Sequence, residues 1–287
     1  MATDGVPLAV YEHGDPGAAT IVAIHGYPDN ASVWNGVVEL LRHRFHVVSY
    51  DVRGAGNSGV PSQRAGYRLD QLEADFSAVL EAVSPDRPVH LLAHDWGSVQ
   101  GWQFVTSERL RGRIVSYTSI SGPGLNHAAR WVRAKLRPSA ADLRSLGWQL
   151  AHSYYLVLFQ VPLLPELAWR SGLLDRLLGQ RPSGTDAQAA AQRSTADKIH
   201  GLELYRANRS PRQPHSRRTD VPIQVLAPTG DRFVGQPLQT EAPRPYASDL
   251  RIRSIDGGHW IMQRHPDVVA QACADLVDEV ARWPVAR

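Results

Sequence analysis

The chain has 287 residues, of which 43% are hydrophobic and 21% charged, and its formal net charge is +3 at pH 7. This composition is ordinary for a soluble globular protein, and the length allows one large domain with an insertion or two small domains. A charge this small for the size excludes the strongly basic character that indicates a nucleic-acid-binding protein.

Six short apolar runs predict buried strands of a mostly parallel sheet, because helical patterns alternate with them. They are Thr20–Gly26, Phe45–Asp51, Pro88–His94, Ile114–Ile120, Pro222–Pro228 and Leu250–Asp256. Two helices are indicated by apolar residues at helical spacing. The first stripe is formed by Leu72, Phe76, Val79 and Val83, and the second by Val269, Cys273, Leu276 and Val280. Asp70 and Glu73 are expected to cap the first helix, and the second is entered through Pro266.

The alternation of strands and helices stops after Gly124 and resumes near Pro222. The intervening residues read as helices rich in Leu, Trp, Tyr and Arg, with two loop-like pieces at 179–188 and 208–218. We therefore expect an α/β core of residues 1–124 and 219–287, and a helical lid of residues 125–218. Such insertions over the carboxyl edge of a sheet usually cover the ligand crevice.

The first loop after a predicted strand is His25-Gly26-Tyr27-Pro28. Loops at this place supply a backbone N–H to an oxyanion hole, and the second N–H comes from the residue after the nucleophile. This nominates Tyr27 and Trp96 as backbone donors, with their rings expected to line the pocket.

A glycine-rich loop, Arg53–Gly59, contains a formal G-x-G-x-x-G. A dinucleotide site is not expected here, because a charged "YDVR" precedes the glycines and no strand ending in an acidic residue follows at the right distance. The segment is interpreted as a tight loop below the crevice.

The stretch "VHLLAHDWGSVQG" predicts a strand that breaks sharply into a helix, the place where many hydrolases carry a serine nucleophile. Here the central residue is Asp95, with the small residues Ala93 and Gly97 two positions away on either side. The alternative interpretation of Asp95 is an ordinary helix N-cap, a role that aspartate fills well.

Two residues after later strands complete a candidate triad. Asp231 follows Pro222–Pro228, and His259 follows Leu250–Asp256. The order nucleophile, acid, histidine is the one that this kind of sheet uses. Each residue alone could be a simple turn or loop residue, but three suitable residue types at three strand ends favour a catalytic site.

These motifs together resemble the α/β-hydrolase-fold epoxide hydrolases, in particular the hydrolase half of actinobacterial fusion proteins. The matching pieces are "HGYP", "YDVRGAGNS", "LLAHDWGS", "LYRAN", "TGDRF" and "GGHW". The resemblance covers nearly the whole chain and is weakest in the lid. It implies an α/β-hydrolase fold with a mostly parallel eight-stranded sheet flanked by helices and an inserted helical lid.

The resemblance also implies site residues. Two lid tyrosines bind the epoxide oxygen in that family; Tyr205 matches one, and Tyr155, with Tyr154 as the alternative, matches the other. The oxyanion and substrate-binding set implied by the matched motifs and the aromatic lid consists of Tyr27, Trp96, His25, Pro28, Tyr154, Trp148, Phe159 and Trp260. The aromatic lid suggests a bulky apolar epoxide.

A carboxylate suits attack on a saturated epoxide carbon because it already carries its charge at neutral pH. The expected mechanism is ring opening by Asp95, protonation of the alkoxide by Tyr155 and Tyr205, and hydrolysis of the ester by water that His259 activates. The substrates are an apolar epoxide and water. No cofactor is expected, and no metal-ligand spacing is found.

Three alternatives remain open. A haloalkane-type dehalogenase of the same fold shares the aspartate, the histidine and the tryptophan. An esterase is disfavoured, because Ser98 lies three residues past Asp95 inside the helix. The third alternative is a non-catalytic ligand-binding protein that retains the pocket.

Cys273 is the only cysteine, which suits a reducing compartment. No signal peptide is apparent in "MATDGVPLAVYEHGDPG", and the most apolar stretch, Tyr154–Trp169, is too short and interrupted to span a bilayer. A cytoplasmic location is therefore expected. The sequence leaves the oligomeric state open.

Overall fold

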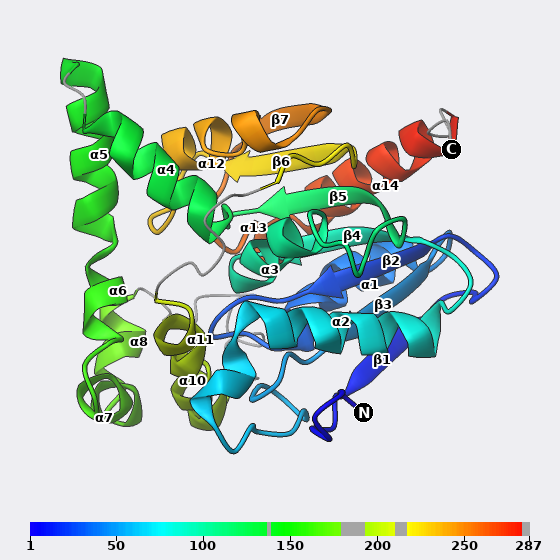
Figure 1. Cartoon of the computed structure of the whole chain (residues 1–287), viewed down its shortest axis with the longest axis horizontal. Coiled ribbons are helices and arrows are strands. Elements are labelled where there is room, and N and C mark those ends of the chain that lie inside the picture. The colour runs from blue at the N-terminus through cyan, green and yellow to red at the C-terminus, as the bar shows by residue number, and fades with distance from the viewer. Residues whose placement is uncertain (137–138, 179–192, 210–216, 283–287) are drawn as a thin grey trace.

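The computed structural model describes residues 1–136, 139–178, 193–209 and 217–282, and its centre is a seven-stranded sheet (Figure 1). The order across the sheet is β1-β3-β2-β4-β5-β6-β7, with β1 antiparallel to β3 and all other neighbours parallel. The strands are β1 Val10–His13, β2 Thr20–Ile24, β3 His46–Tyr50, β4 Val89–His94, β5 Ile114–Ile120, β6 Ile223–Pro228 and β7 Leu250–Ile255.

The predicted α/β-hydrolase fold is confirmed, and each of the six predicted strands is present within one or two residues of its expected bounds. The expected strand count of eight is wrong for the described residues, where the sheet has seven strands. Only β1 precedes β2, because Gly5 and Pro7 interrupt the chain before it and proline cannot donate to a strand ladder. β1 itself was not predicted, since this short antiparallel edge strand is only partly buried.

Helices cover both faces of the sheet, which explains why its strands are almost continuously apolar. Alternate residues of β2 point to opposite faces: Val22 and Ile24 join one core cluster, and Ile21 and Ala23 join the other. The first cluster includes α2 (Leu69–Val83) and α3 (Trp96–Phe104), and the second includes α1 (Asn35–Leu41), α13 (Ile261–Arg264) and α14 (Pro266–Arg282). The remaining elements of this part are α12 (Gln236–Glu241) and the short 3-10 helices Ala31–Trp34, Arg64–Tyr67 and Arg244–Tyr246.

The predicted cap of α2 is wrong. The helix begins at Leu69, so Asp70 lies inside the first turn instead of before it, and Arg68 occupies the N-cap position without a side-chain hydrogen bond. The Leu69 N–H instead donates to the side-chain oxygen of Asn208, at 3.0 Å. A residue 139 positions away therefore takes the role that a local acid was expected to fill.

Between β5 and β6, the described part of the chain forms helices and, at Thr219, an isolated parallel β-bridge to Ala247. The helices are α4 Leu125–Lys135, α5 Ala140–His152, α6 Tyr154–Leu158, α7 Leu164–Arg170, α8 Leu173–Leu177, α10 Thr195–His200 and α11 Leu202–Ala207. Figure 1 shows these helices at the end of the sheet toward which β5 and β6 point. The loop-like piece at 179–188 lies outside the described residues, as does most of the piece at 208–218.

None of the helices in the described part of the chain combines the length and apolarity that crossing a bilayer requires.

Candidate active site

Asp95 stands at the sharp turn between β4 and α3, with φ 50° and ψ −119°, a backbone conformation that non-glycine residues rarely adopt. Glycines allow this turn to pack closely. A Cβ on Gly97 would lie 2.3 Å from the Ile24 carbonyl oxygen, and one on Gly26 would lie 2.4 Å from the Asp95 Cβ. The Asp95 side chain makes no capping hydrogen bond to α3. It is instead one of the side chains that line a pocket, so the geometry differs from that of an ordinary N-cap.

The predicted triad residues meet at the carboxyl end of the sheet. His259 Nε2 lies 3.7 Å from Asp95 Oδ2, and His259 Nδ1 lies 3.0 Å from Asp231 Oδ2. Asp231 is held in place because its Oδ1 accepts hydrogen bonds from the backbone N–H groups of Phe233 and Val234. All three triad side chains are largely buried. The Nε2 side of the His259 ring therefore faces the Asp95 carboxylate, while the Asp231 carboxylate on the Nδ1 side orients the ring.

Burial raises the pKa of Asp95 to about 6, an effect that the nearby His259 and the backbone N–H groups of Tyr27 and Trp96 partly offset. The carboxylate is therefore still mainly ionised at neutral pH, although less strongly than an exposed aspartate. A desolvated anion is a stronger nucleophile than a hydrated one, since less water must be removed before it reacts.

The other two groups shift in the directions expected of an ion pair. Burial alone would lower the pKa of His259, but the charge and hydrogen bond of Asp231, together with the charge of Asp95, raise it. Burial would raise the pKa of Asp231, but His259 and the two backbone N–H groups hold it below its usual value. Asp231 thus stays charged and stabilises the protonated imidazole.

The two predicted oxyanion donors both lie at Asp95. The Tyr27 N–H donates to Asp95 Oδ1 at 2.8 Å, and the Trp96 N–H also interacts with the carboxylate. An oxygen of Asp95 therefore already occupies the position where an oxyanion would form if the carboxylate carried an ester.

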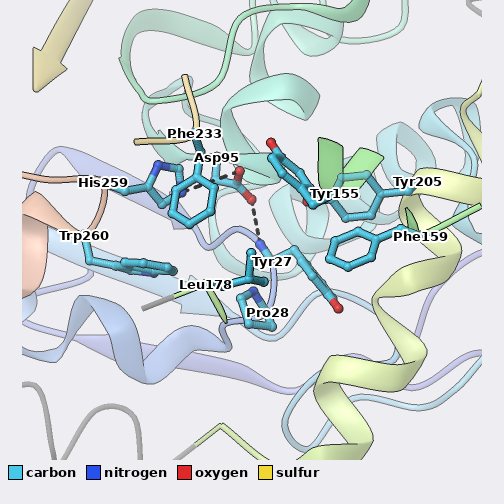
Figure 2. A pocket seen from close by; sticks show the side chains of 10 residues that line it. All are labelled: Tyr27, Pro28, Asp95, Tyr155, Phe159, Leu178, Tyr205, Phe233, His259 and Trp260. Atoms are coloured by element: carbon cyan, nitrogen blue, oxygen red, sulfur yellow. Dashed lines mark hydrogen bonds and ion pairs between the residues drawn. The ribbon is translucent and has the colours of Figure 1, made fainter. Parts of the chain in front are cut away.

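Tyr155 and Tyr205 face Asp95 from the helical insertion, on α6 and α11 (Figure 2). Both are buried, and burial followed by the charge of Asp95 raises both pKa values above the usual value for tyrosine. Their rings meet edge to face with centroids 6.2 Å apart, and the Trp96 ring also meets the Tyr205 ring edge to face, at 5.0 Å. Both phenols are therefore protonated donors at neutral pH.

These side chains line one pocket (Figure 2). Eight of its ten lining residues were predicted from the sequence: Tyr27, Pro28, Asp95, Tyr155, Phe159, Tyr205, His259 and Trp260. The two that sequence reasoning missed are Phe233 and Leu178. Phe233 ends the motif "TGDRF" and could have been found from its place two residues after Asp231, whereas nothing in the sequence distinguishes Leu178 from its neighbours.

Four predicted binding residues do not line the pocket. The expectation for the Trp96 ring is wrong, because this ring is buried against Tyr205, edge to face with centroids 5.0 Å apart, outside the pocket lining. His25 is buried beside it, but its ring holds the loop together: Nε2 accepts from the Val52 N–H, and Nδ1 donates to the Gly26 carbonyl. Tyr154 is 50% exposed, so the choice that the sequence left open falls on Tyr155 for the pocket position. Trp148 stacks on His152 at the surface, with ring centroids 3.9 Å apart.

Hydrogen bonds that sequence reasoning did not predict tie the loop after β2, which contains His25–Pro28, to the helical insertion. The Tyr27 hydroxyl donates to the Lys198 carbonyl at 2.7 Å and accepts from the Trp169 indole N–H at 2.7 Å. Next to it, Asp29 forms a buried ion pair with Arg193 and accepts from the Trp260 indole N–H at 2.8 Å. The loop after β2 is thus connected to α7 and to the start of α10.

The glycine-rich loop follows β3 without leading into a helix. Gly54 and Gly56 have φ values of +79° and +51°, and the Gly54 N–H donates to the Gly59 carbonyl. A Cβ on Gly56 would lie 2.2 Å from the Asp51 carboxylate, so this close approach requires glycine. Because no helix N-terminus follows these glycines directly, the loop lacks the phosphate-binding geometry of a dinucleotide site.

No group of three or more His, Cys, Asp or Glu side chains in the described ranges is arranged to hold a metal ion.

Comparison with known proteins gives consistent matches. A family model described as alpha/beta hydrolase fold matches residues 19–266. The chain is 36% identical to the probable oxidoreductase EphD of Mycobacterium tuberculosis, over 96% of this chain but only 48% of that protein's length. It is 31% identical to epoxide hydrolase A of the same organism, over 96% of this chain and 95% of that protein.

Solved structures agree on the fold. A Bacillus megaterium epoxide hydrolase in complex with an inhibitor superimposes with a TM-score of 0.76 at 20% identity, covering 97% of this chain and 99% of that one. The epoxide hydrolase VrEH1 from Vigna radiata gives a TM-score of 0.75 at 20% identity, covering 97% and 96%. At this level of identity, the similarity establishes the fold alone.

Proposed function

This chain belongs to the epoxide hydrolase family of the α/β-hydrolase fold, and we propose that it opens an apolar epoxide to a vicinal diol through a covalent ester on Asp95. One observation carries the proposal: a buried aspartate lies in one pocket with a histidine–aspartate pair and two tyrosines. Because the chain spans about half the length of EphD, that protein's name says nothing of activity in this chain.

In the first step, a carboxylate oxygen of Asp95 attacks an epoxide carbon, and the carbon–oxygen bond of the ring breaks. The ring oxygen leaves as an alkoxide that stays attached to the substrate. Tyr155 and Tyr205 donate hydrogen bonds to it, and one of them transfers a proton. Burial in the pocket favours this role, because it keeps both hydroxyls protonated until the alkoxide, a stronger base, forms.

In the second step, His259 removes a proton from water, and the hydroxide attacks the carbonyl carbon of the ester. The oxyanion takes the place that Asp95 Oδ1 occupies now, where it accepts from the N–H groups of Tyr27 and Trp96. One such donor is worth about 3 kcal/mol of transition-state stabilisation in comparable sites. Collapse of this intermediate breaks the bond between the carbonyl carbon and the substrate oxygen, and that oxygen takes up the proton of the added hydroxyl, so that the diol leaves and the carboxylate is restored. The proton held by His259 then returns to the tyrosinate left by the first step, which restores the resting enzyme.

The protonation state of His259 is expected to change between the first and the second step. Asp95 as an anion raises the pKa of His259, and esterification removes that anion. The pKa of His259 therefore falls when the ester forms, which favours the neutral imidazole that must act as the base. The coupling between the two groups prepares the base for the second step only after the first is complete.

The dehalogenase alternative lacks a supporting observation. A dehalogenase needs N–H donors directed at a halide ion, but the Trp96 side chain does not line the pocket, and the side chains that face Asp95 from the insertion are two phenols. Assays with terminal chloroalkanes are therefore expected to release no halide.

The test is a single turnover with excess enzyme in ¹⁸O-labelled water. The proposal predicts an unlabelled diol, with the heavy oxygen found in the peptide that contains Asp95, because the new diol oxygen comes from the carboxylate. Label in the diol after one turnover would mean direct attack by water and would overturn the covalent route. The absence of diol formation from a broad set of apolar epoxides would overturn the proposed activity itself.

A further inference from the structure

The outer side of α6–α8 exposes large aliphatic side chains to an unusual degree. Six of them between residues 157 and 177 are 48–73% exposed: Val157, Leu163, Leu164, Leu167, Leu173 and Leu177. We call this set the outer apolar patch. Single exposed leucines are common on soluble proteins, but a concentration in three consecutive short helices is typical of an interaction surface.

These side chains lie on the outward faces of helices whose inward faces are already packed against the rest of the protein. α7 already buries Ala168 and Trp169 against the rest of the protein, while Leu163 and Leu167 lie one helical turn apart on its exposed side. In α8, Leu174 is fully buried, and Leu173 and Leu177, again one turn apart, are exposed. α7 and α8 pack against each other, so their exposed sides form one surface.

The charges of the same helices favour an anionic partner. Arg170 and Arg176 are exposed, and within the described part of the chain neither makes an ion pair. The two acidic residues of these helices are already neutralised: Glu166 pairs with Arg206 at 2.6 Å and Asp175 pairs with Lys198 at 2.7 Å. The available charge of the patch is therefore positive.

A second copy of the chain fits this surface poorly. A twofold interface places the same patch on both sides, so each unpaired arginine would approach a surface of like charge. Phosphate headgroups of a bilayer, in contrast, offer the planar guanidinium groups suitable acceptors, and the acyl region beneath accepts the leucines.

We propose that the outer apolar patch docks onto the surface of an anionic lipid bilayer, with its leucines inserted at the acyl boundary and its arginines on headgroup phosphates. The pocket lies close by along the chain, because Leu178 lines it and follows Leu177 directly, and Phe159 lines it two residues after Val157. Docking would therefore place one wall of the pocket next to the bilayer, in which apolar molecules dissolve.

The experiment is co-sedimentation of the purified full chain with lipid vesicles, without any epoxide, so that its result does not depend on the proposed catalysis. We expect binding to phosphatidylglycerol-containing vesicles that weakens with salt, and little binding to pure phosphatidylcholine. The double variant Leu167→Ser/Leu173→Ser should lower the partition coefficient at least about tenfold. Arg170→Gln/Arg176→Gln should lower it about fivefold for each charge removed.

The matched control is Leu40→Ser/Arg42→Gln at the C-terminal end of α1, where both side chains are exposed and Arg42 pairs with Glu39; this change should leave binding unaltered. Failure of the wild-type chain to bind anionic vesicles would overturn the proposal, as would binding that the patch variants do not weaken. If light scattering shows that the wild-type chain is a dimer and that Leu167→Ser/Leu173→Ser is a monomer, the patch would instead be the interface with a second copy of the chain.

Discussion

At the level of single residues, the proposed chemistry depends on how burial sets the charge of Asp95. The pocket removes water from this carboxylate and raises its pKa, while His259 and two backbone N–H groups keep the anion accessible near neutral pH. The histidine is in turn kept basic by Asp231. In the proposed mechanism, these surroundings would allow three groups of ordinary intrinsic acidity to act as an anionic nucleophile, a base and a permanent counter-charge.

The pH dependence of ring opening follows from the pKa of about 6 for Asp95. The anion is the reactive form, so the rate constant for ester formation should be constant above this pH and fall about tenfold per pH unit below it. The measurement is the single-turnover rate of ester formation by rapid quench between pH 4.5 and 8. A rate that stays constant down to pH 4.5 would mean that the carboxylate keeps the acidity of an exposed aspartate.

Loss of one phenol should slow ring opening selectively. In Tyr205→Phe, the developing alkoxide loses one of two proposed hydrogen-bond donors, so ester formation should slow by about 10- to 100-fold, while ester hydrolysis changes much less. Rapid-quench measurement of both steps separates the two effects. Tyr154→Phe is the matched control, since Tyr154 lies half exposed outside the pocket and its hydroxyl should not affect either step. Equal slowing of both steps in Tyr205→Phe would instead indicate general damage to the pocket.

At the level of elements, the site is assembled from strand ends on one side and short helices on the other. β4, β6 and β7 bring the triad residues to the same edge of the sheet, and α6 and α11 bring the two tyrosines above them. The loop after β2 contacts both parts, because the Tyr27 backbone reaches Asp95 while its hydroxyl reaches α7 and the carbonyl of Lys198.

The Tyr27 hydroxyl is therefore expected to hold the loop to the insertion. Tyr27→Phe leaves the Lys198 carbonyl and the Trp169 indole N–H buried without this partner, which should lower the free energy of unfolding by about 2 kcal/mol. Denaturant titration measures this change. Tyr50→Phe is the matched control, because the buried Tyr50 hydroxyl makes no hydrogen bond to any described residue. Its removal should be neutral or stabilising, and equal losses in both variants would contradict the proposed connection.

At the level of the whole molecule, a buried ion pair joins the helical insertion to the sheet-based part of the chain. Arg193 and Asp29 are almost fully buried, and the guanidinium also lies over the Trp260 ring, 4.8 Å from its centroid. A buried pair adds little net stability, but removing one partner leaves an uncompensated charge in a region of low polarity.

Arg193→Met should therefore lower the free energy of unfolding by about 3 kcal/mol, because Asp29 keeps its buried charge and loses its counter-ion. The comparison is Arg44→Met, which breaks an ion pair with Asp278 in which both side chains are at least 40% exposed. That change should cost less than about 1 kcal/mol. Thermal and denaturant unfolding measure the free energy of unfolding of the two variants. Similar decreases in both would show that the ion pair between Arg193 and Asp29 is exposed to water in solution.

Much of the fold could be predicted from the sequence because its signals are local. Continuous apolar runs predicted six strands that the sheet contains, and the helical stripe from Val269 predicted α14. The triad residues could be nominated because parallel strands end at one edge of a sheet, so three suitable side chains after three strands must lie near one another. Their catalytic roles remain proposals that the isotope and rate experiments test.

What the sequence determined by itself was the order of the strands along the chain, their burial and the residue types at their ends. Only the tertiary structure decided which side chains meet. In the folded protein, Tyr155 and not Tyr154 lines the pocket, and the His25 ring holds its own loop together. Trp148 lies at the surface, and the side chain of Asn208 accepts a hydrogen bond at the start of α2. The reason is physical: strand and helix patterns arise from neighbours in sequence, whereas a hydrogen bond or a pocket wall depends on partners that packing brings together from distant parts of the chain.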